Sequence, residues 1–492
     1  MSRKHTAAAA LGAALILSML TLIPGPAAGE TGEAGARITA GSDAGEIGKA
    51  DAGKAGGTAA GMSGATGAGK DHLDLRCLRT ADTGSVLSAR RYCLQAAMAP
   101  GASADALLHH ARQQLRPAGR DRGQPEKAAE ALLRILEQKP DFLPALMELG
   151  RLRYNQRRYE EALELFRRAG EQGHPDALLQ LGLMIRDGRG TAPDPRAAAG
   201  IFLRAARLGE PRSQAVLREY YGSGMPELNV EQSYFWALAA SMNGSYAAAS
   251  ALPSDARRLP AGKQQEIRDQ VDIWLGSLGD PAGQCLRLMD MDSPSAAFGF
   301  CQRATGNASD PRIQQIRLIL ADLLMAGSPD RNPDPARALM LYERAAAGGS
   351  AQGAYMTGDF YDRQIRGVTV GDSRKKAAEY FLQAAQQDHQ KACLRLGEAY
   401  ETGRGIPRKQ EEALKWLEKA ARLGSEEGAN RLGLLLAGSG DHLQGAFWLT
   451  VAARWGHRTA ETALKAELRK LSSREREETE EHVREFLRQD LN

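Results

Sequence analysis

The ten residues LGLMIRDGRG at positions 181–190 return with the same pattern as LGEAYETGRG at positions 396–405. In both places a proline-containing connection follows, and then an alanine-rich segment that ends in the same five residues, AARLG, at 205–209 and at 420–424. The similarity therefore extends over a complete unit of chain. Such self-similarity at a fixed offset is the sequence signature of a repeat protein.

The residue pattern of each unit predicts two antiparallel helices. Alanine and glycine recur where two helices must approach closely, and leucine and aromatic residues at spacings of three and four fill the space to the next pair. Glycines suited to a left-handed terminating position follow the helices at Gly188, Gly209, Gly403 and Gly424. Because one hairpin alone leaves an apolar face uncovered, we expect the hairpins to stack into an all-α solenoid.

The unit resembles a known repeat. Leu-Gly, then Gly-x-Gly, a variable connection and Ala-Ala-x-x-Gly is similar to the Sel-one-like repeat, a relative of the tetratricopeptide repeat. Residues 145–173, with YEEA at 159–162 and FRRA at 166–169, resemble the tetratricopeptide form more closely. The resemblance covers residues 103–490 and implies an α-solenoid of helix hairpins in an exported protein. It says little about the ligand.

The whole set of repeats is itself duplicated. The segment around Trp236 corresponds to the segment around Trp448 at an offset of 212 residues, and a longer charged stretch follows each, at 252–275 and at 464–487. We interpret these stretches as closing helices that cover the last repeat. Each half is therefore expected to hold four hairpins and a cap.

The sequence divides into four predicted segments. Residues 1–28 have a basic start, an apolar stretch and small residues, which is typical of a secretory signal peptide, although an uncleaved anchor would look similar. Residues 29–70 are rich in glycine and alanine and are predicted to be a disordered linker. Two helical arrays then follow, at 71–279 and 280–492. We expect an exported protein, periplasmic or secreted, with no membrane span after signal cleavage.

Four cysteines form a duplicated motif. Cys77 and Cys93 have the same 16-residue spacing as Cys285 and Cys301, at an offset of 208 residues. In an oxidising compartment this spacing predicts a disulfide in the first hairpin of each array, and a redox pair or a metal site is the alternative. Cys393 stands alone among small residues, so we expect a buried, inert thiol.

The composition agrees with a helical chain and points away from nucleic acid. Aromatic residues make up 5% of the 492 residues, and much of the 43% hydrophobic content is alanine, which favours close helix packing over a sheet. The formal net charge of +4 gives no support to nucleic-acid binding. Both signs alternate in the most charged run, from Arg469 to Arg488, which predicts a solvated helix surface.

The histidines predict no cofactor and no metal site. Adjacent residues such as His109 and His110 point to different sides of a helix, and we expect both at the surface. His174 and His389 occupy the same repeat position between hairpins, where a turn or capping role is expected.

One motif leaves an enzymatic alternative open. Ser373 and Lys376 fit Ser-x-x-Lys, and some cysteine-rich relatives of the repeat family are described as penicillin-binding or β-lactamase-like. The partner motifs Ser-Asp-Asn and Lys-Thr-Gly are absent from the sequence, and a helix cap is expected at Ser373. The alternative is a cell-wall-related hydrolase, or an activator of a cell-wall enzyme.

The preferred hypothesis is a non-enzymatic scaffold whose concave surface binds protein or peptide partners, possibly in envelope or exopolysaccharide-secretion assembly. Exposed aromatic residues on the first helix of each hairpin are the candidates to line this surface, with ordinary packing as the alternative role. These candidates are Tyr154, Tyr220, Tyr221, Tyr355, Tyr361 and Tyr400.

Overall fold

The computed structural model describes residues 102–115, 124–224, 228–328, 331–364 and 373–489. All of these lie in one compact unit, Leu73–Asn492. The predicted signal peptide, the linker and the pair Cys77 and Cys93 lie outside the described residues, so they stay predictions.

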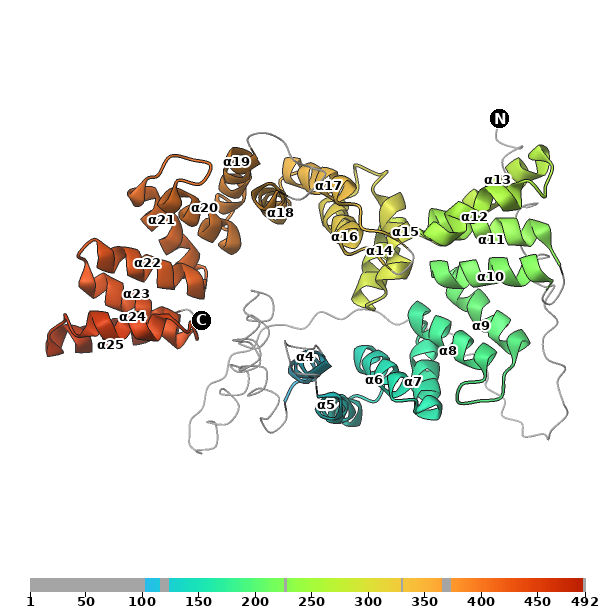
Figure 1. The fold of residues 1–492 in the computed structure, drawn as a ribbon, viewed down its shortest axis with the longest axis horizontal. Coiled ribbons are helices and arrows are strands. Elements are labelled where there is room, and N and C mark those ends of the chain that lie inside the picture. Colours follow the sequence, from blue (N-terminus) through green and yellow to red (C-terminus); the bar gives the residue numbers. More distant parts are fainter. Residues whose placement is uncertain (1–101, 116–123, 225–227, 329–330, 365–372, 490–492) are drawn as a thin grey trace, which may run out of the picture. The chain divides into compact units, whose positions relative to one another are not determined.

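The described residues form 22 α-helices and no strand, apart from an isolated bridge between Ser328 and Arg331, so the all-α prediction is confirmed. The helices follow one another along the chain as shown in Figure 1. In the first half they are α4 (Ala104–Leu115), α5 (Pro125–Gln138), α6 (Leu143–Asn155), α7 (Tyr159–Glu171), α8 (Pro175–Asp187), α9 (Pro195–Arg207), α10 (Pro211–Ser223), α11 (Val230–Met242), α12 (Tyr246–Ala256) and α13 (Ala261–Ser277). In the second half they are α14 (Pro281–Asp290), α15 (Pro294–Ala304), α16 (Ile313–Ala326), α17 (Pro335–Ala347), α18 (Ala351–Arg363), α19 (Ser373–Ala385), α20 (Gln390–Thr402), α21 (Gln410–Arg422), α22 (Glu426–Gly438), α23 (His442–Arg454), α24 (Ala460–Leu468) and α25 (Ser473–Gln489).

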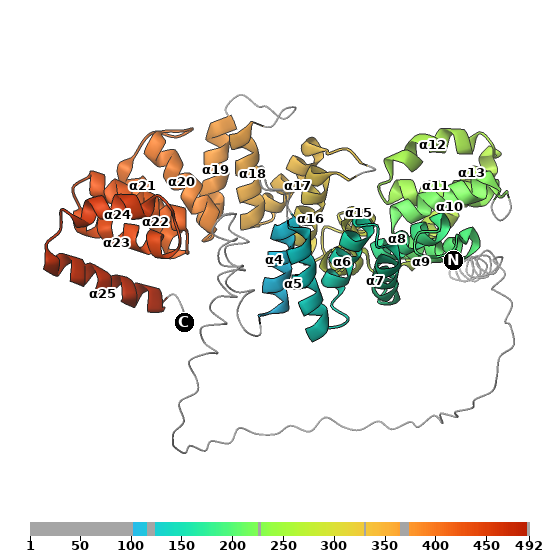
Figure 2. The same ribbon diagram turned by 60° about the horizontal axis from the view of Figure 1, so that its bottom comes forward.

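Successive helices pair as hairpins because the first helix of a pair carries a glycine where the second carries a large side chain. A Cβ atom on Gly182 would lie 2.6 Å from the Phe202 ring, and one on Gly397 would lie 2.7 Å from Leu417 Cγ. The two glycines are 215 residues apart, so residues related by the sequence offset make the same kind of packing contact in both halves. Figure 2 shows α18 beside α19 and α4 beside α5 as such pairs.

The ends of the helices are set as the sequence predicts. Gly188 and Gly403 end α8 and α20 in the left-handed conformation, with φ of 69° and 75°. His174 and His389 cap the starts of the same two helices, since each ring Nδ1 accepts a hydrogen bond from a backbone N–H three residues on, at 3.3 and 3.2 Å. The predicted capping role of these histidines is confirmed.

Matching aromatic clusters cover the last hairpin of each half. The Trp274 ring of α13 lies 5.5 Å from the Trp236 ring, and the Phe486 ring of α25 lies 5.4 Å from the Trp448 ring. Both pairs keep the offset of 212 residues. Each predicted closing stretch is two helices rather than one, the end of α12 with α13, and the end of α24 with α25.

The expected number of four hairpins per half is wrong for residues 280–492, where the described residues form five. The first of the five is α14 with α15, whose helices have 10 and 11 residues; it is the hairpin in which the cysteine spacing predicts a disulfide. Cys285 and Cys301 form a disulfide between these two helices, with the Cα atoms 4.9 Å apart and both side chains fully buried. Cys393 is free and fully buried, as expected.

The disulfide hairpin packs on the first half of the chain. Ser293 Oγ donates to Asp176 Oδ2 at 3.1 Å. Arg303 Nη1 donates to Asn243 Oδ1 at 2.8 Å. These contacts cross the predicted boundary between residues 279 and 280. The hairpin lies in the second array by its position in the sequence, but it also contacts the first array.

A buried carboxyl lies close to this joint. Glu210 is fully buried and caps α10, where it accepts hydrogen bonds from the backbone N–H groups of Arg212 and Ser213. Burial raises the pKa of the Glu210 carboxyl from 4.5 to about 7, and the nearby charge of Asp176 acts in the same direction. The folded chain therefore holds this proton at pH values where the unfolded chain has lost it.

We expect the stability of the wild-type chain to fall, relative to that of Glu210→Gln, as the pH rises from 4.5 to 7, and the difference to stay constant above pH 7. The direction follows because the folded state binds the extra proton in that window. The size is about 1–3 kcal/mol, since one pKa unit corresponds to about 1.4 kcal/mol. Urea unfolding of both proteins across this pH range measures it. A difference that is independent of pH would contradict the assignment.

Candidate partner-binding cleft

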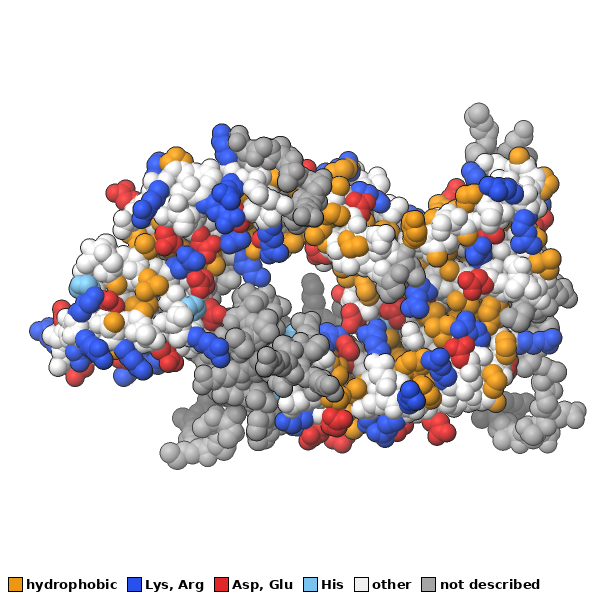
Figure 3. Space-filling model, in the orientation of Figure 1, with side chains coloured by type: hydrophobic (Ala, Val, Ile, Leu, Met, Phe, Trp, Pro, Cys, Tyr) orange, Lys and Arg blue, Asp and Glu red, His pale blue; other side chains and the backbone are white. Residues whose placement is uncertain are grey.

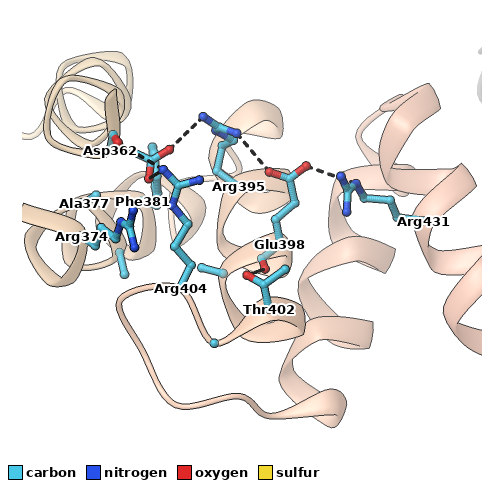
Figure 4. A pocket seen from close by; sticks show the side chains of 12 residues that line it. Asp362, Arg374, Ala377, Phe381, Arg395, Glu398, Thr402, Arg404 and Arg431 are labelled. Atoms are coloured by element: carbon cyan, nitrogen blue, oxygen red, sulfur yellow. Dashed lines mark hydrogen bonds and ion pairs between the residues drawn. The ribbon is translucent and has the colours of Figure 1, made fainter. Parts of the chain in front are cut away.

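A charged cleft of about 620 Å³ lies over α18, α19, α20 and α22. Figure 4 shows its charged lining side chains pointing toward one another from these helices and from the turn after α20. In Figure 3 basic and acidic side chains lie next to each other over this part of the molecule. The cleft is lined by Asp362, Arg374, Ala377, Ala378, Phe381, Arg395, Glu398, Ala399, Thr402, Gly403, Arg404 and Arg431.

Ion pairs connect the first helices of three successive hairpins across the cleft. Arg395 of α20 lies 3.0 Å from Asp362 of α18 and 3.1 Å from Glu398 on its own helix. Glu398 in turn lies 3.1 Å from Arg431 of α22. Arg404, in the turn after α20, lies 2.9 Å from Asp362. The arginines are therefore held in position before any partner arrives.

Two of these arginines keep a firm positive charge. Burial alone would lower the pKa of Arg395, but the carboxylates of Glu398 and Asp362 outweigh it and leave that pKa above its usual value. The pKa of Arg431 is raised in the same way, with burial opposed chiefly by Glu398 and Glu427. Both arginines belong to the ladder of ion pairs that runs from Asp362 through Arg395 and Glu398 to Arg431, and both therefore stay charged over the physiological pH range.

The lining has more positive than negative charge. Four arginines and two carboxylates, Asp362 and Glu398, are among the lining residues. Outside the lining, Asp359 also pairs with Arg395, and Glu401 and Glu427 also pair with Arg431. Arg374 is exposed and forms no ion pair within the part of the chain that the structure describes. Arg404 has one ion pair and keeps 48% of its side chain exposed. Arg374 and Arg404 are the more exposed of the four arginines, so an incoming anion would meet their guanidinium groups first.

The floor of the cleft is apolar. Ala377 and Phe381 of α19 are buried below the charged groups. Phe381 packs against Gly358 of α18, where a Cβ atom would lie 2.7 Å from the ring. The cleft can therefore receive a chain segment with an acidic group at the rim and small apolar atoms below it.

The equivalent surface in the first half has different chemistry. A Cβ atom on Gly190 would lie 2.6 Å from the Tyr159 carbonyl oxygen, and one on Gly405 would lie 2.3 Å from the Arg374 carbonyl oxygen. Tyr159 therefore stands where the second half has Arg374. The Arg189 guanidinium lies 5.4 Å from the Tyr154 ring centroid and 6.0 Å from that of Tyr159. An aromatic cluster thus replaces the arginine-rich rim.

The six candidate tyrosines do not form one exposed surface. Tyr220 and Tyr361 are each only 6% exposed, so the expectation that their rings are exposed is wrong. Tyr220 packs against Phe202 in the core, and Tyr361 donates a hydrogen bond to Glu343 at 2.7 Å.

The other four tyrosines are half-buried. Tyr355 stacks on the His389 ring at 4.6 Å, Tyr154 contacts Tyr159, and Tyr221 and Tyr400 pack against core clusters. Their roles in binding stay predictions.

Three further predictions concern individual side chains. His110 is 8% exposed, so its expected surface position is wrong; it lies on the face of α4 that packs in the core.

Ser373 begins α19 and is 5% exposed, and its hydroxyl accepts a hydrogen bond from Gln364 at 3.3 Å. The Lys376 ammonium group lies 5.4 Å from the Tyr361 ring centroid. Burial raises the pKa of the Cys393 thiol to about 11, which agrees with an inert thiol.

The repeat family can now be compared with known proteins. The model of the Sel1 repeat matches residues 175–210, 217–245, 318–350, 351–389 and 390–425. These hairpins are Sel1 repeats. The last two of them carry most of the cleft, from Asp362 to Arg404. A tetratricopeptide repeat model matches residues 120–183, which confirms the resemblance seen there in the sequence. A helical scaffold of Sel1 and tetratricopeptide-like repeats is generally a protein-interaction fold.

Two solved structures with this kind of repeat are similar to the chain. One is a protective antigen present in uropathogenic Escherichia coli strains, described as displaying an SLR fold, with 19% identity, a TM-score of 0.38, and coverage of 84% of this chain and 94% of that one. The other is a Sel1 repeat protein from Oxalobacter formigenes, with 22% identity, a TM-score of 0.28, and coverage of 73% and 93%. Among curated proteins no significant match is found.

Two kinds of feature are absent from the described ranges of the chain. No group of three or more His, Cys, Asp or Glu side chains there is arranged to hold a metal ion. No helix there has both the length and the apolar character that crossing a membrane requires.

Proposed function

We propose that this protein is an exported, non-enzymatic scaffold that binds an acidic segment of a partner protein in the cleft of its second half. The observation that carries the proposal is the surplus of arginines over an apolar floor on a Sel1-repeat surface. Export follows from the predicted signal peptide at residues 1–28. A role in envelope or exopolysaccharide-secretion assembly would suit a scaffold in that compartment.

The charge of the cleft favours an acidic partner. A carboxylate that approaches Arg374 and Arg404 meets two guanidinium groups, and Arg–carboxylate pairs are among the stronger hydrogen bonds in proteins. Arg395 and Arg431 are already fixed by their ion pairs, so little side-chain freedom is lost when a partner binds. Glu398 and Asp362 would repel a carboxylate placed deeper, which directs it to the rim.

The position of the cleft favours a polypeptide segment over a small molecule. Small-molecule sites are mostly apolar and enclose their ligand, whereas charged side chains make up half of this lining. The charged groups lie on the first helices of three successive hairpins, so an extended segment can contact more than one hairpin. Such recognition of several residues on one rigid surface is the usual way in which helical repeats bind.

The experiment is affinity capture from envelope extracts with the immobilised protein. The double variant Arg374→Glu with Arg404→Gln is expected to retain at least tenfold less partner, because each lost charge-assisted hydrogen bond is worth about 1.5–3 kcal/mol. Capture by the wild-type protein should also fall with added salt. Mass spectrometry of the bound fraction measures both effects.

The matched control is Arg422→Glu, an exposed arginine of α21 that does not line the cleft and whose ion-pair partner among the described residues is Glu418 on its own helix. This variant should capture the same partner as the wild type. The proposal is contradicted if the double variant and the wild type capture equal amounts of partner while circular dichroism shows that both are folded. The cleft would then not be the binding site.

A further inference from the structure

Three basic residues in succession lie at the start of α19, a helix that borders the cleft. Arg374, Lys375 and Lys376 are the second to fourth residues of this helix, and its first turn contains no acidic residue. The start of an α-helix is its positive end, where acidic side chains stabilise the helix and basic ones do not. The three cations therefore stand at a position that is unfavourable for the helix itself.

Two equivalent helices have the opposite charge at this position. The helices are aligned by the large residue that packs on a glycine of the preceding helix, which is Phe166 in α7, Phe381 in α19 and Leu417 in α21. Counted back from that residue, Lys375 and Lys376 match the glutamate pairs at 160–161 and 411–412. The reversed charge gives α19 no structural gain, and a position that breaks a local rule in this way is where a functional role is expected.

The three cations continue the edge of the cleft. A Cβ atom on Gly405 would lie 2.3 Å from the Arg374 carbonyl oxygen, so the start of α19 lies against the turn that holds Arg404. On the other side, the Lys376 ammonium group lies 5.4 Å from the Tyr361 ring centroid of α18. In Figure 3 Lys and Arg side chains gather where Figure 1 labels α19. We call Arg404, Arg374, Lys375 and Lys376 the basic strip.

Little negative charge opposes the basic strip. Within the part of the chain that the structure describes, Arg374, Lys375 and Lys376 form no ion pair, and this includes Glu379 one turn further along α19. Arg404 has one carboxylate partner, Asp362, at 2.9 Å. Four cations thus share one paired carboxylate. Such a surface attracts a segment with several negative charges more strongly than a segment with one.

We propose that the partner segment carries a run of at least three acidic residues and crosses the basic strip as it leaves the cleft. This inference rests on the proposed function, because it extends the same site. One carboxylate lies at Arg374 and Arg404, and the next ones lie at Lys375 and Lys376. The apolar floor at Phe381 favours a polypeptide over an acidic sugar polymer, because a peptide has apolar groups beside its acids.

The test is fluorescence anisotropy of the full mature chain with two labelled peptides of equal length. Both consist of alanine and glycine, with a single Glu in one and four successive Glu residues in the other. The wild type should bind the four-Glu peptide at least tenfold more tightly at low salt, and added salt should reduce this difference.

The variant that isolates the basic strip is Lys375→Gln with Lys376→Gln. It should bind the two peptides with affinities within about twofold of each other, because Arg374 and Arg404 remain for a single carboxylate. The control is Lys127→Gln with Arg422→Gln, which removes two exposed cations elsewhere and should keep the tenfold difference. The strip variant should also unfold at or above the wild-type temperature, because cations leave the positive end of α19.

Each contrary result has its own meaning. Equal binding of both peptides by the wild type, or an undiminished tenfold difference in the strip variant, overturns the acidic run and leaves the proposed function standing. A strip variant that melts below the wild type overturns it too, since the cations would then be structural. Tighter binding of a uronic-acid oligomer than of the four-Glu peptide overturns the choice of a polypeptide. Binding of neither peptide overturns the proposed function together with this inference.

Discussion

Trp274→Ala should unfold the end of the first array at a clearly lower urea concentration, with a loss of about 3–5 kcal/mol, the usual cost of removing a large buried aromatic side chain. Trp274 is 7% exposed, and its ring contacts those of Phe235 and Trp236 at 5.7 and 5.5 Å. Without this ring, α13 loses its aromatic contacts with α11. Urea titrations followed by circular dichroism measure the change.

The adjacent Ile273 provides the matched control. It lies on the same helix but is 53% exposed, so Ile273→Ala should change the free energy of unfolding by less than about 0.5 kcal/mol. Phe486→Ala should destabilise the second array through the equivalent cluster with Phe447 and Trp448. A Trp274→Ala midpoint equal to that of Ile273→Ala would show that α13 does not close the array.

Gly353→Ala is expected to destabilise the second array by about 1–3 kcal/mol, although alanine is the better helix former. A Cβ atom at Gly353 would lie 2.8 Å from both the Ala345 Cβ and the Ala346 backbone nitrogen of α17. Backbone cannot move aside as a side chain can, so α17 and α18 must separate. Thermal and urea unfolding of the full chain detect this.

The same substitution at Gly200 should have the opposite effect on stability. Gly200 lies inside α9, and a Cβ atom there meets nothing within 4 Å. Gly200→Ala should therefore stabilise the protein by about 0.5–1 kcal/mol through helix propensity alone. If both alanine variants were stabilising, the close contact between α17 and α18 would not explain why residue 353 is glycine.

Features that depend on neighbouring residues could be predicted from sequence. Gly188 and His174 act within one turn of their own helix, so their terminating and capping roles follow from local pattern. The pairing of α8 with α9 and of α20 with α21 also follows, because each hairpin is continuous in the chain and its small residues recur at fixed positions.

The cleft was missed because charges on a helix are usually solvated, and no single segment contains the ladder. Arg395 and Glu398 are one turn apart on α20, but their partners Asp362 and Arg431 lie on the first helices of the neighbouring repeats. A signal was present at matching positions of successive repeats, since Arg395 and Arg431 are each the sixth residue of their helices. Tyrosine is a poor guide to a binding surface in this fold, because rings such as Tyr361 fill the space between hairpins.

The packing of the disulfide hairpin on the first half could not be predicted either. Ser293 and Asp176 are 117 residues apart, and nothing local links them. The cysteine spacing predicts only that α14 and α15 stay together. The division into arrays at 71–279 and 280–492 stays a prediction, and a cut at that boundary would expose Phe298 and Phe300.

The most direct test of the acidic-segment proposal is a selection of peptides from a random display library on the purified wild-type protein. The account predicts that the selected peptides are enriched in Asp and Glu. It also predicts that they lose binding to the variant with Arg374→Glu and Arg404→Gln and keep it with Arg422→Glu. Selected peptides without acidic residues, or with equal binding to all three proteins, would contradict it.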